Sequence, residues 1–454
     1  MKNDKTGSID MINGPIFKSL IMFAIPVMIS NIFQMLYNTM DVAIVGHVLG
    51  EESLSAIGAC STIYEVLVGF ALGTGRGLAI VTARCYGERN IERLKQSVAG
   101  ALIVGGATSI SLTVIGRLAL RSVMRLLNTP EEIFEESYSY VSLIILWIIV
   151  MFAYNLFSGL LQALGNSFMP LVFLVISSLT NIFLDYMFIA RFKMGVQGAA
   201  VATVIAQGIS AVLCFIYILK KEPVLIPKRK HFNIPKQMYI EIATQGYALA
   251  FMSSVVSLGS VILQSGINGL GAMVIAGHTA ARKIMPFYNL PFNSVGMAMT
   301  TFCSQNRGAN RGDRIIKAYR YVLTYCAVMA CVIGVIAFVS SGYLVRIITG
   351  SDNPTIIGNA TTYLRVEGPF TFFLGIIFAC RNGLQGLGEK RLPIISSVIE
   401  LIGKILFVIF LIPVFGYTAV IFCEPSIWVV MAIQLLIALK SNKYLQRFRK
   451  TGQE

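Results

Sequence analysis

The sequence predicts an all-α membrane protein with twelve transmembrane helices in two pseudo-symmetric lobes of six helices each. Three observations lead to this prediction: the composition, the length of the apolar runs and an internal duplication. Of the 454 residues, 56% are hydrophobic and only 13% are charged. Ordinary soluble domains contain roughly 25% charged residues, so water is not the main solvent of this chain.

Twelve apolar runs are each long enough to cross a bilayer, which takes about 20 predominantly apolar residues per helix. The first run contains no charged residue between Leu20 and Met40. The predicted spans are 20–45, 54–80, 96–116, 138–161, 169–190, 196–219, 241–264, 279–303, 319–341, 362–386, 393–415 and 418–439. An even number of spans places both termini on the same side of the membrane.

Lys and Arg gather in the loops of one side, for example in the stretches 84–95 and 307–320. By the positive-inside rule this side faces the cytoplasm, together with both termini. We therefore expect a multi-pass protein of the cell membrane, with the polar start of the chain leading into an uncleaved first span rather than a signal peptide. The net charge of +15 is attributed to orientation and contact with anionic lipid, and no nucleic-acid partner is expected.

The second half of the sequence repeats the first. The segment 162–165 (Gln-Ala-Leu-Gly) recurs as 385–388 (Gln-Gly-Leu-Gly), and Leu-Gly at 49–50 recurs at 270–271. Because six spans separate the equivalent positions, both copies keep the same orientation in the membrane. The predicted domains are an amino-terminal lobe, a basic cytoplasmic linker, a carboxyl-terminal lobe and a cytoplasmic tail, at 1–219, 220–240, 241–440 and 441–454.

Ionisable side chains within spans are costly unless they are paired or hydrated, so each one is a functional candidate. Asp41 lies late in the first span, Asn181 and Asp185 lie late in the fifth, and Thr203 lies early in the sixth. The alternating directions of these spans place all four residues at a similar depth. Two carboxylates with an amide and a hydroxyl predict a site for H+ or Na+, because hard cations prefer oxygen ligands.

The alternative is that a basic neighbour neutralises each acid. Arg76 is the only Lys or Arg predicted inside a first-half span, and it follows Glu65 by roughly 16 Å along the helix axis at about 1.5 Å per residue. Asp41 and Asp185 therefore have no predicted counter-ion. Glu65 is a candidate for the substrate cavity or for a structural role, and the sequence leaves both open.

The second half has a different set of charges. The positions equivalent to Asp41 and Asp185 are apolar, whereas Glu400 and Lys404 have the i, i+4 spacing of an intrahelical ion pair, which we interpret as structural. Four other charged residues lie near predicted span ends, from which their side chains could extend to the membrane surface: Arg365, Glu367, Arg381 and Glu424.

Pro26 removes a backbone hydrogen bond from the first span and predicts a bend, either passive or acting as a hinge. Gly69, Gly73 and Gly77 form a stripe that is typical of close helix packing. The eight cysteines form no CxxC pair, and no HExxH or nucleotide-binding loop occurs. We therefore expect no enzyme activity, no cofactor, and no metal other than a possible Na+ at the site of Asp41, Asn181, Asp185 and Thr203.

Several segments together resemble transporters of the multidrug and toxic compound extrusion (MATE) family, in its prokaryotic DinF-like branch. They are 37–46 (Tyr-Asn-Thr-Met-Asp-Val-Ala-Ile-Val-Gly), the turn at 162–165 before Pro170, 181–185 (Asn-Ile-Phe-Leu-Asp) and 198–203 (Gly-Ala-Ala-Val-Ala-Thr). The likeness covers nearly the whole chain, and it rests on the order, spacing and duplication of these segments rather than on any single one.

The resemblance implies a V-shaped pair of six-helix lobes that export cationic or amphipathic compounds in exchange for H+ or Na+. Tyr37 and Asn155 are implied to line the cavity next to the cation site, and Pro26 is implied to be the point where the first helix bends. The expected partners are the lipid bilayer and small organic molecules, with the chain as a monomer. The implied cation site consists of Asp41, Asn181, Asp185 and Thr203.

A flippase for lipid-linked oligosaccharides, from the same superfamily, is the competing interpretation. Its anionic substrate would favour a cavity rich in Arg and Lys, whereas the unpaired charges in the first half are mainly acidic. The sequence therefore favours export of cationic or neutral compounds. It does not identify the compound, choose between H+ and Na+ or give the oligomeric state.

Overall fold

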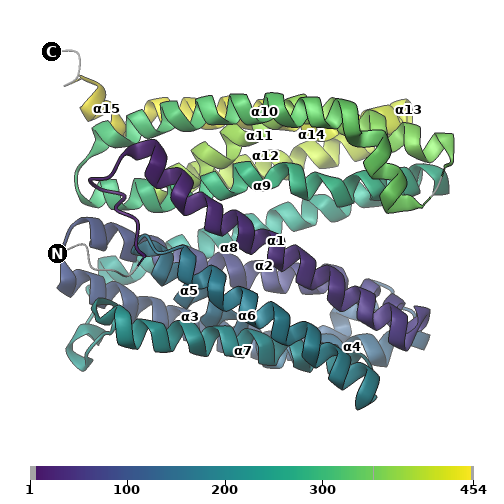
Figure 1. The fold of residues 1–454 in the computed structure, drawn as a ribbon, viewed down its shortest axis with the longest axis horizontal. Helices are drawn as coiled ribbons and strands as arrows, with labels where there is room; N and C mark the ends of the chain where they lie inside the picture. Colours follow the sequence, from purple (N-terminus) through teal and green to yellow (C-terminus); the bar gives the residue numbers. More distant parts are fainter. Residues whose placement is uncertain (1–6, 351, 451–454) are drawn as a thin grey trace. The chain divides into compact units, whose positions relative to one another are not determined.

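The computed structural model describes residues 7–350 and 352–450, and this part of the chain consists of helices and loops without β-strands (Figure 1). The predicted all-α fold is confirmed. The α-helices are α1 (Ile16–Leu49), α2 (Glu51–Gly87), α3 (Ile91–Leu126), α4 (Glu131–Leu146), α5 (Ile148–Ala163), α6 (Phe168–Asp185), α7 (Gly195–Lys221), α8 (Lys236–Asn268), α9 (Ala272–Gly308), α10 (Gly312–Thr349), α11 (Pro354–Gly386), α12 (Arg391–Leu406), α13 (Ile412–Phe415), α14 (Tyr417–Ser441) and α15 (Lys443–Lys450). The short segments are the π-helices η1 (Tyr186–Arg191) and η4 (Phe407–Leu411) and the 3₁₀-helices η2 (Pro223–Leu225) and η3 (Arg229–Phe232).

Nine of the twelve predicted spans each fall on one helix, and 138–161, 169–190 and 393–415 each cover consecutive helical segments. Within the described residues, ten helical stretches are long and apolar enough to cross a membrane, and the bent pair α4–α5 is an eleventh candidate. The predicted span 279–303 lies in α9, which is not among them. Its sequence explains why, because Pro286, Asn289, Pro291 and Asn293 lie in the middle of α9 and lower its hydropathy.

The predicted span 138–161 is divided by a bend of 47° between α4 and α5. Trp147 separates the two helices with backbone angles φ −106° and ψ 17°. No proline or glycine lies at this point, so the sequence carries no signal for the break. The equivalent helix in the second half, α11, is continuous even though it contains Pro369.

The duplicated sequence segments also have duplicated backbone geometry. Gly50 precedes α2 with φ 91°, and Gly271 precedes α9 with φ 94°. Gly165 follows α5 with φ 90°, and Gly388 follows α11 with φ 74°. These conformations are readily adopted only by glycine, which gives a physical reason for glycine at both members of each pair.

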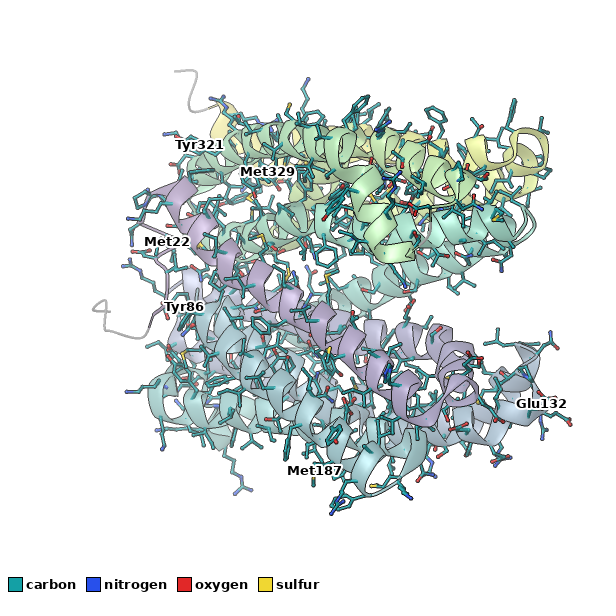
Figure 2. The ribbon with its side chains drawn as sticks, turned by 45° about the vertical axis from the view of Figure 1, so that its right-hand side comes forward. Met22, Tyr86, Glu132, Met187, Tyr321 and Met329 are labelled. Carbon is teal, nitrogen blue, oxygen red and sulfur yellow. The ribbon has the colours of Figure 1, made fainter. Side chains whose placement is uncertain are left out.

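A π-helical segment follows α6 in the first half and α12 in the second. In the first of these, Phe192 N donates to Met187 O at 2.9 Å, the five-residue spacing that defines a π-helix; Met187 is labelled in Figure 2. Such segments are rare and often lie at functional sites. The first segment begins directly after Asp185.

The contacts within the chain divide it into two compact units. The first unit contains the residues up to Asp10 and Ile25–Ser254, and the second contains Met11–Ala24 and the residues from Val255 onward. The divisions fall inside α1, next to Pro26, and inside α8. The domain limits at 219 and 241 stay a prediction.

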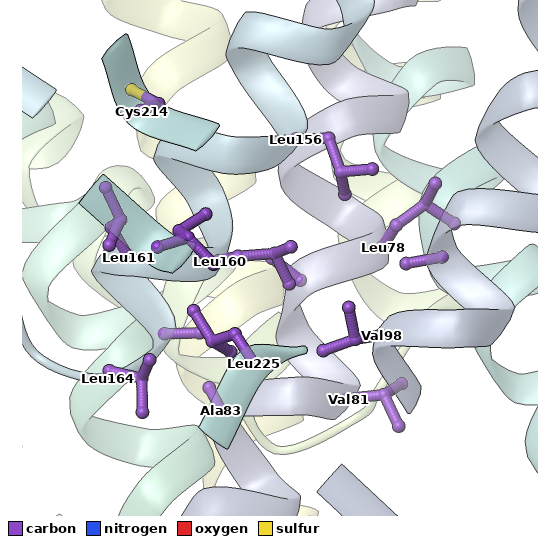
Figure 3. Packing of buried hydrophobic residues seen from close by; sticks show 14 of the residues in the cluster. Leu78, Val81, Ala83, Val98, Leu156, Leu160, Leu161, Leu164, Cys214 and Leu225 are labelled. Carbon is purple, nitrogen blue, oxygen red and sulfur yellow. The ribbon is translucent and has the colours of Figure 1, made fainter. Parts of the chain in front are cut away.

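The first unit has a large apolar core between α2, α3, α5 and α7. Figure 3 shows Leu78 of α2, Val98 of α3 and Leu160 of α5 in this cluster, together with Cys214 of α7. Each of these four side chains is at most 2% exposed. The cluster also contains Phe173 and Leu174 of α6, so it holds α6 and α7, two of the helices that carry the polar residues described next.

Candidate cation-binding site

Two buried aspartates in the first unit come from different helices. Asp41 of α1 is 9% exposed, and Asp185, the last residue of α6, is 0% exposed. The two carboxylates are close enough to interact electrostatically. Oδ1 of Asp41 and both carboxylate oxygens of Asp185 accept no hydrogen bond from the described residues. Because a buried carboxylate without a partner is costly, this pair can readily accept a cation.

Asn181 and Thr203 contribute further unpaired polar atoms. Asn181 precedes Asp185 by one turn of α6 and is 0% exposed, and Thr203 of α7 is 1% exposed. Both side-chain atoms of the Asn181 amide and the Thr203 hydroxyl lack hydrogen-bond partners within the described chain. Two carboxylates, one amide oxygen and one hydroxyl thus form a buried set of oxygen donors.

Three tyrosines surround Asp41. The Tyr37 hydroxyl lies near Thr203, although the Thr203 oxygen is outside normal hydrogen-bond geometry. Tyr64 of α2 and Tyr140 of α4 also interact electrostatically with Asp41, and their ring centroids are 6.4 Å apart. Sequence reasoning missed Tyr64 and Tyr140, because no feature of the sequence shows which way their side chains face.

Apolar packing holds the three helices of the site in register. Val45 of α1, Ile189 of η1 and Ala199 of α7 belong to one buried cluster and are at most 1% exposed. Each lies four residues from a polar residue of the site, so each shares that residue's helix face. Gly198 allows η1 to approach α7, since a Cβ there would lie 3.1 Å from the Cβ of Phe188.

The other predicted site residues have the following contacts. Asn155 of α5 donates its amide to Met151 O at 2.7 Å and packs against Gly75 of α2, where a Cβ would lie 3.0 Å from that of Asn155. Glu65 is exposed and lies near Tyr64. The helix α1 continues through Pro26, whose carbonyl accepts a hydrogen bond from Ser30 Oγ at 2.9 Å.

In the second unit, Glu400 and Lys404 belong to a larger network. Lys404 Nζ lies 3.0 Å from Glu400 Oε1 and 3.5 Å from Glu424 Oε1. Arg282 Nη1 lies 3.3 Å from Glu424 Oε1, and Arg381 Nη2 lies 3.8 Å from Glu400 Oε2. Glu424 is therefore buried in ion pairs, and Arg381 is 13% exposed and paired with Glu400. The expectation that these two side chains extend to the membrane surface was wrong.

Glu367 of α11 is also buried rather than extended to the surface. It is 0% exposed, and neither of its carboxylate oxygens accepts a hydrogen bond from the described residues. Tyr363, one turn earlier, lies 3.5 Å from Glu424, and the ring of His278 is 5.0 Å from its ring. Sequence reasoning also missed Arg282, Tyr363 and His278, which the packing of α9 and α11 brings to this network.

Comparison with known proteins agrees with the fold and with the duplication. A family model described as MatE matches residues 26–187 and, a second time, residues 248–410. The chain is 27% identical over 395 residues to the probable multidrug resistance protein YpnP of Bacillus subtilis, covering 86% of this chain and 87% of that protein. It is 26% identical over 389 residues to the probable multidrug resistance protein NorM of Thermotoga maritima, covering 85% and 83%.

Solved structures show the same fold. A MATE protein in the bent conformation gives a TM-score of 0.89 at 21% identity, covering 99% of this chain and 100% of that one. The outward-facing conformation of a multidrug resistance MATE family transporter gives 0.89 at 22% identity, covering 98% and 99%. The fold, the internal repeat and the buried polar cluster define a multi-pass α-helical membrane transporter. The chain belongs to the MATE family of multidrug efflux transporters.

Proposed function

We propose that this chain is a secondary antiporter that exports cationic or amphipathic organic compounds in exchange for H+ or Na+. The coupling ion binds at Asp41, Asn181, Asp185 and Thr203. The observation that carries the proposal is a pair of buried aspartates with no basic partner among the described residues. Beside them lie an amide and a hydroxyl whose oxygens accept no hydrogen bond from that part of the chain. The relatives named for multidrug resistance support the substrate class.

The chemistry of the site suits reversible binding of a coupling ion. Two carboxylates near each other repel when both are ionised, so binding one proton or one Na+ relieves that repulsion. The amide and hydroxyl oxygens offer two neutral ligands to a metal cation, while a proton needs only a carboxylate. Alternating access of the two halves would release the ion on one side of the membrane and the organic compound on the other.

The proposal also includes the location of the protein, its topology, its oligomeric state and its source of energy. We place the protein in the cell membrane, with both termini in the cytoplasm, because the loops rich in Lys and Arg then lie inside. The chain acts as a monomer, and an ion gradient rather than an organic cofactor or ATP drives the cycle.

The test is efflux of a cationic dye from cells that express the wild type, Asp41→Asn or Asp185→Asn. Each substitution keeps the side-chain shape and removes the negative charge, so efflux should fall at least tenfold at equal expression. Asp352→Asn is the matched control, because the Asp352 side chain is 92% exposed and its ion pair is with exposed Arg346. Collapsing the proton and sodium gradients separately identifies the coupling ion.

Two results would contradict the proposal. If both aspartate variants pump as well as the wild type, the coupling ion binds elsewhere. If the wild type moves no cationic dye but moves a lipid-linked oligosaccharide in reconstituted vesicles, the protein is a flippase.

A further inference from the structure

A groove of about 610 Å³ lies between α10 and α11 in the second unit, within the range of roughly 300–1,000 Å³ of ligand pockets. Its lining residues on α10 include Ala327, Cys331, Gly334 and Phe338, whose spacing of i, i+4, i+7 and i+11 defines a single helix face. From α11 it is lined by Pro369 and Phe372. All the lining side chains are apolar, and none of these residues belongs to the candidate cation site or the ion-pair network.

A positively charged side chain, that of Arg365, lies at the Phe338 end of this groove. Arg365 precedes Pro369 by one turn of α11, and its guanidinium carbon lies 5.1 Å from the ring centroid of Phe338. The side chain is exposed and forms no ion pair with the described residues. Arg381, on the same helix, is instead paired with Glu400. Arg365 therefore carries a positive charge that no carboxylate of the described chain neutralises.

The groove has the dimensions of one lipid leaflet. Both α10 and α11 are among the helices that are long and apolar enough to cross a membrane. From Ala327 to Phe338 the lining extends over 11 residues, or about 16 Å at about 1.5 Å per residue, roughly half of the 30 Å hydrocarbon core. An acyl chain of one leaflet matches this length and this apolar lining.

We propose that the groove is a binding site for an anionic phospholipid, with an acyl chain along α10 and the headgroup phosphate on Arg365. An uncompensated Arg within a membrane protein is costly, and the planar guanidinium matches a phosphate through two parallel hydrogen bonds. A zwitterionic lipid such as phosphatidylcholine carries the same phosphate, but its own ammonium offsets that charge, so it gains less from Arg365 than an anionic lipid does. A cationic compound would be repelled by Arg365. This site is independent of the proposed transport cycle.

The test uses the full-length protein in nanodiscs that contain phosphatidylglycerol or phosphatidylcholine, each with a photoactivatable group in the acyl chain. After irradiation, adducts on the peptide 327–338 are quantified by mass spectrometry. The wild type should give several-fold more adduct with phosphatidylglycerol than with phosphatidylcholine. Arg365→Gln should remove that preference, and Arg365→Lys should keep part of it.

Gly334→Leu tests the groove itself. A Cβ at Gly334 would have its nearest contacts at 3.8–3.9 Å, all with Pro369, so the backbone accommodates it while the leucine side chain fills the groove. Adducts from both lipids should then fall. Gly342→Leu, on the same helix, is the matched control, because a Cβ there has no atom within 4 Å; it should leave the adducts unchanged.

Three outcomes would overturn the proposal. Equal labelling by both lipids, with no effect of Arg365→Gln, would show that the headgroup is not recognised. Equal effects of Gly334→Leu and Gly342→Leu, or adducts outside 327–338, would show that the groove is not the site. Displacement of phosphatidylglycerol by a photoactivatable free fatty acid at lower concentration would assign the site to a carboxylate rather than to a phospholipid.

Discussion

Lys404 Nζ lies 3.5 Å from Glu424 Oε1 and so joins α12 to α14 across the interior of the second unit. The two side chains are only 3% and 10% exposed. Removing one partner of a buried ion pair costs far more than the intact pair contributes, because water cannot replace the lost charge. Here Lys404 keeps Glu400 and Glu424 keeps Arg282, so each single substitution leaves the network partly compensated. The network is therefore best tested by comparing single and double substitutions.

Glu424→Gln should lower the free energy of unfolding by up to roughly 3–5 kcal/mol. Arg282 and Lys404 each lose a charged partner, although Lys404 keeps Glu400. Lys404→Met should destabilise by a similar amount. The double variant should lose clearly less than the sum of the two, and thermal unfolding in detergent measures all three. Arg346→Gln, which breaks an exposed pair with Asp352, should cost about 0–1 kcal/mol. Additive losses would mean that the two buried charges do not stabilise each other.

Gly77→Ala should disturb the packing of α2 against α8. A Cβ at Gly77 would lie 2.7 Å from the carbonyl oxygen of Gln245 and 2.8 Å from the Cα of Gly246, both backbone atoms that cannot move aside cheaply. We expect a loss of about 1–3 kcal/mol in unfolding free energy, typical of overpacking. Gly69→Ala is the control on the same stripe, since its nearest contact would be Ser253 Cβ at an ordinary 3.8 Å. A tolerated Gly77→Ala would show that the helices can separate there without cost.

Thr203→Val should separate sodium coupling from proton coupling. The substitution keeps the shape of the side chain and removes one oxygen ligand, while both carboxylates remain. If Na+ is the coupling ion, its binding to purified protein should weaken about tenfold, equivalent to about 1.4 kcal/mol. If H+ is the coupling ion, dye efflux should change little. Thr180→Val is the control on α6, because that exposed hydroxyl bonds only to Ile176 O of its own helix.

Glu222→Gln should stabilise the protein at neutral pH. Burial raises the pKa of the Glu222 carboxyl in the linker after α7, and its Oε1 accepts no hydrogen bond from the described residues. Ionisation therefore penalises the folded state, and this penalty grows as pH rises from the ordinary glutamate pKa, near 4.3, through the raised folded value. The gain in melting temperature over the wild type should be present at pH 7.5 and absent near pH 3.5.

The same substitution at Glu132, an exposed residue at the start of α4 labelled in Figure 2, provides the reference for that experiment. A gain for Glu222→Gln that is equally large at both pH values would contradict the assignment of the effect to buried charge.

The sequence determined where the chain can cross a membrane and that its two halves are copies. Both properties depend on local physics, because a span needs an uninterrupted apolar run and the turns at Gly50 and Gly271 need a left-handed backbone. The candidate acids Asp41 and Asp185 were also visible in the sequence, because a carboxylate inside an apolar run is costly wherever it faces.

Only the tertiary structure decided which side chains meet. In the structure Tyr64 and Tyr140 lie near Asp41, and Glu424 and Arg282 form one network with Lys404. The sequence does not show that these residues are close to one another. Three further features appear only in the structure. The fourth span bends at Trp147, and the Asn155 amide donates a hydrogen bond within its own helix. A groove also lies beside Arg365. The physical reason is that a bilayer specifies the length and polarity of each helix but not its rotation. Contacts between residues far apart in the chain set that rotation.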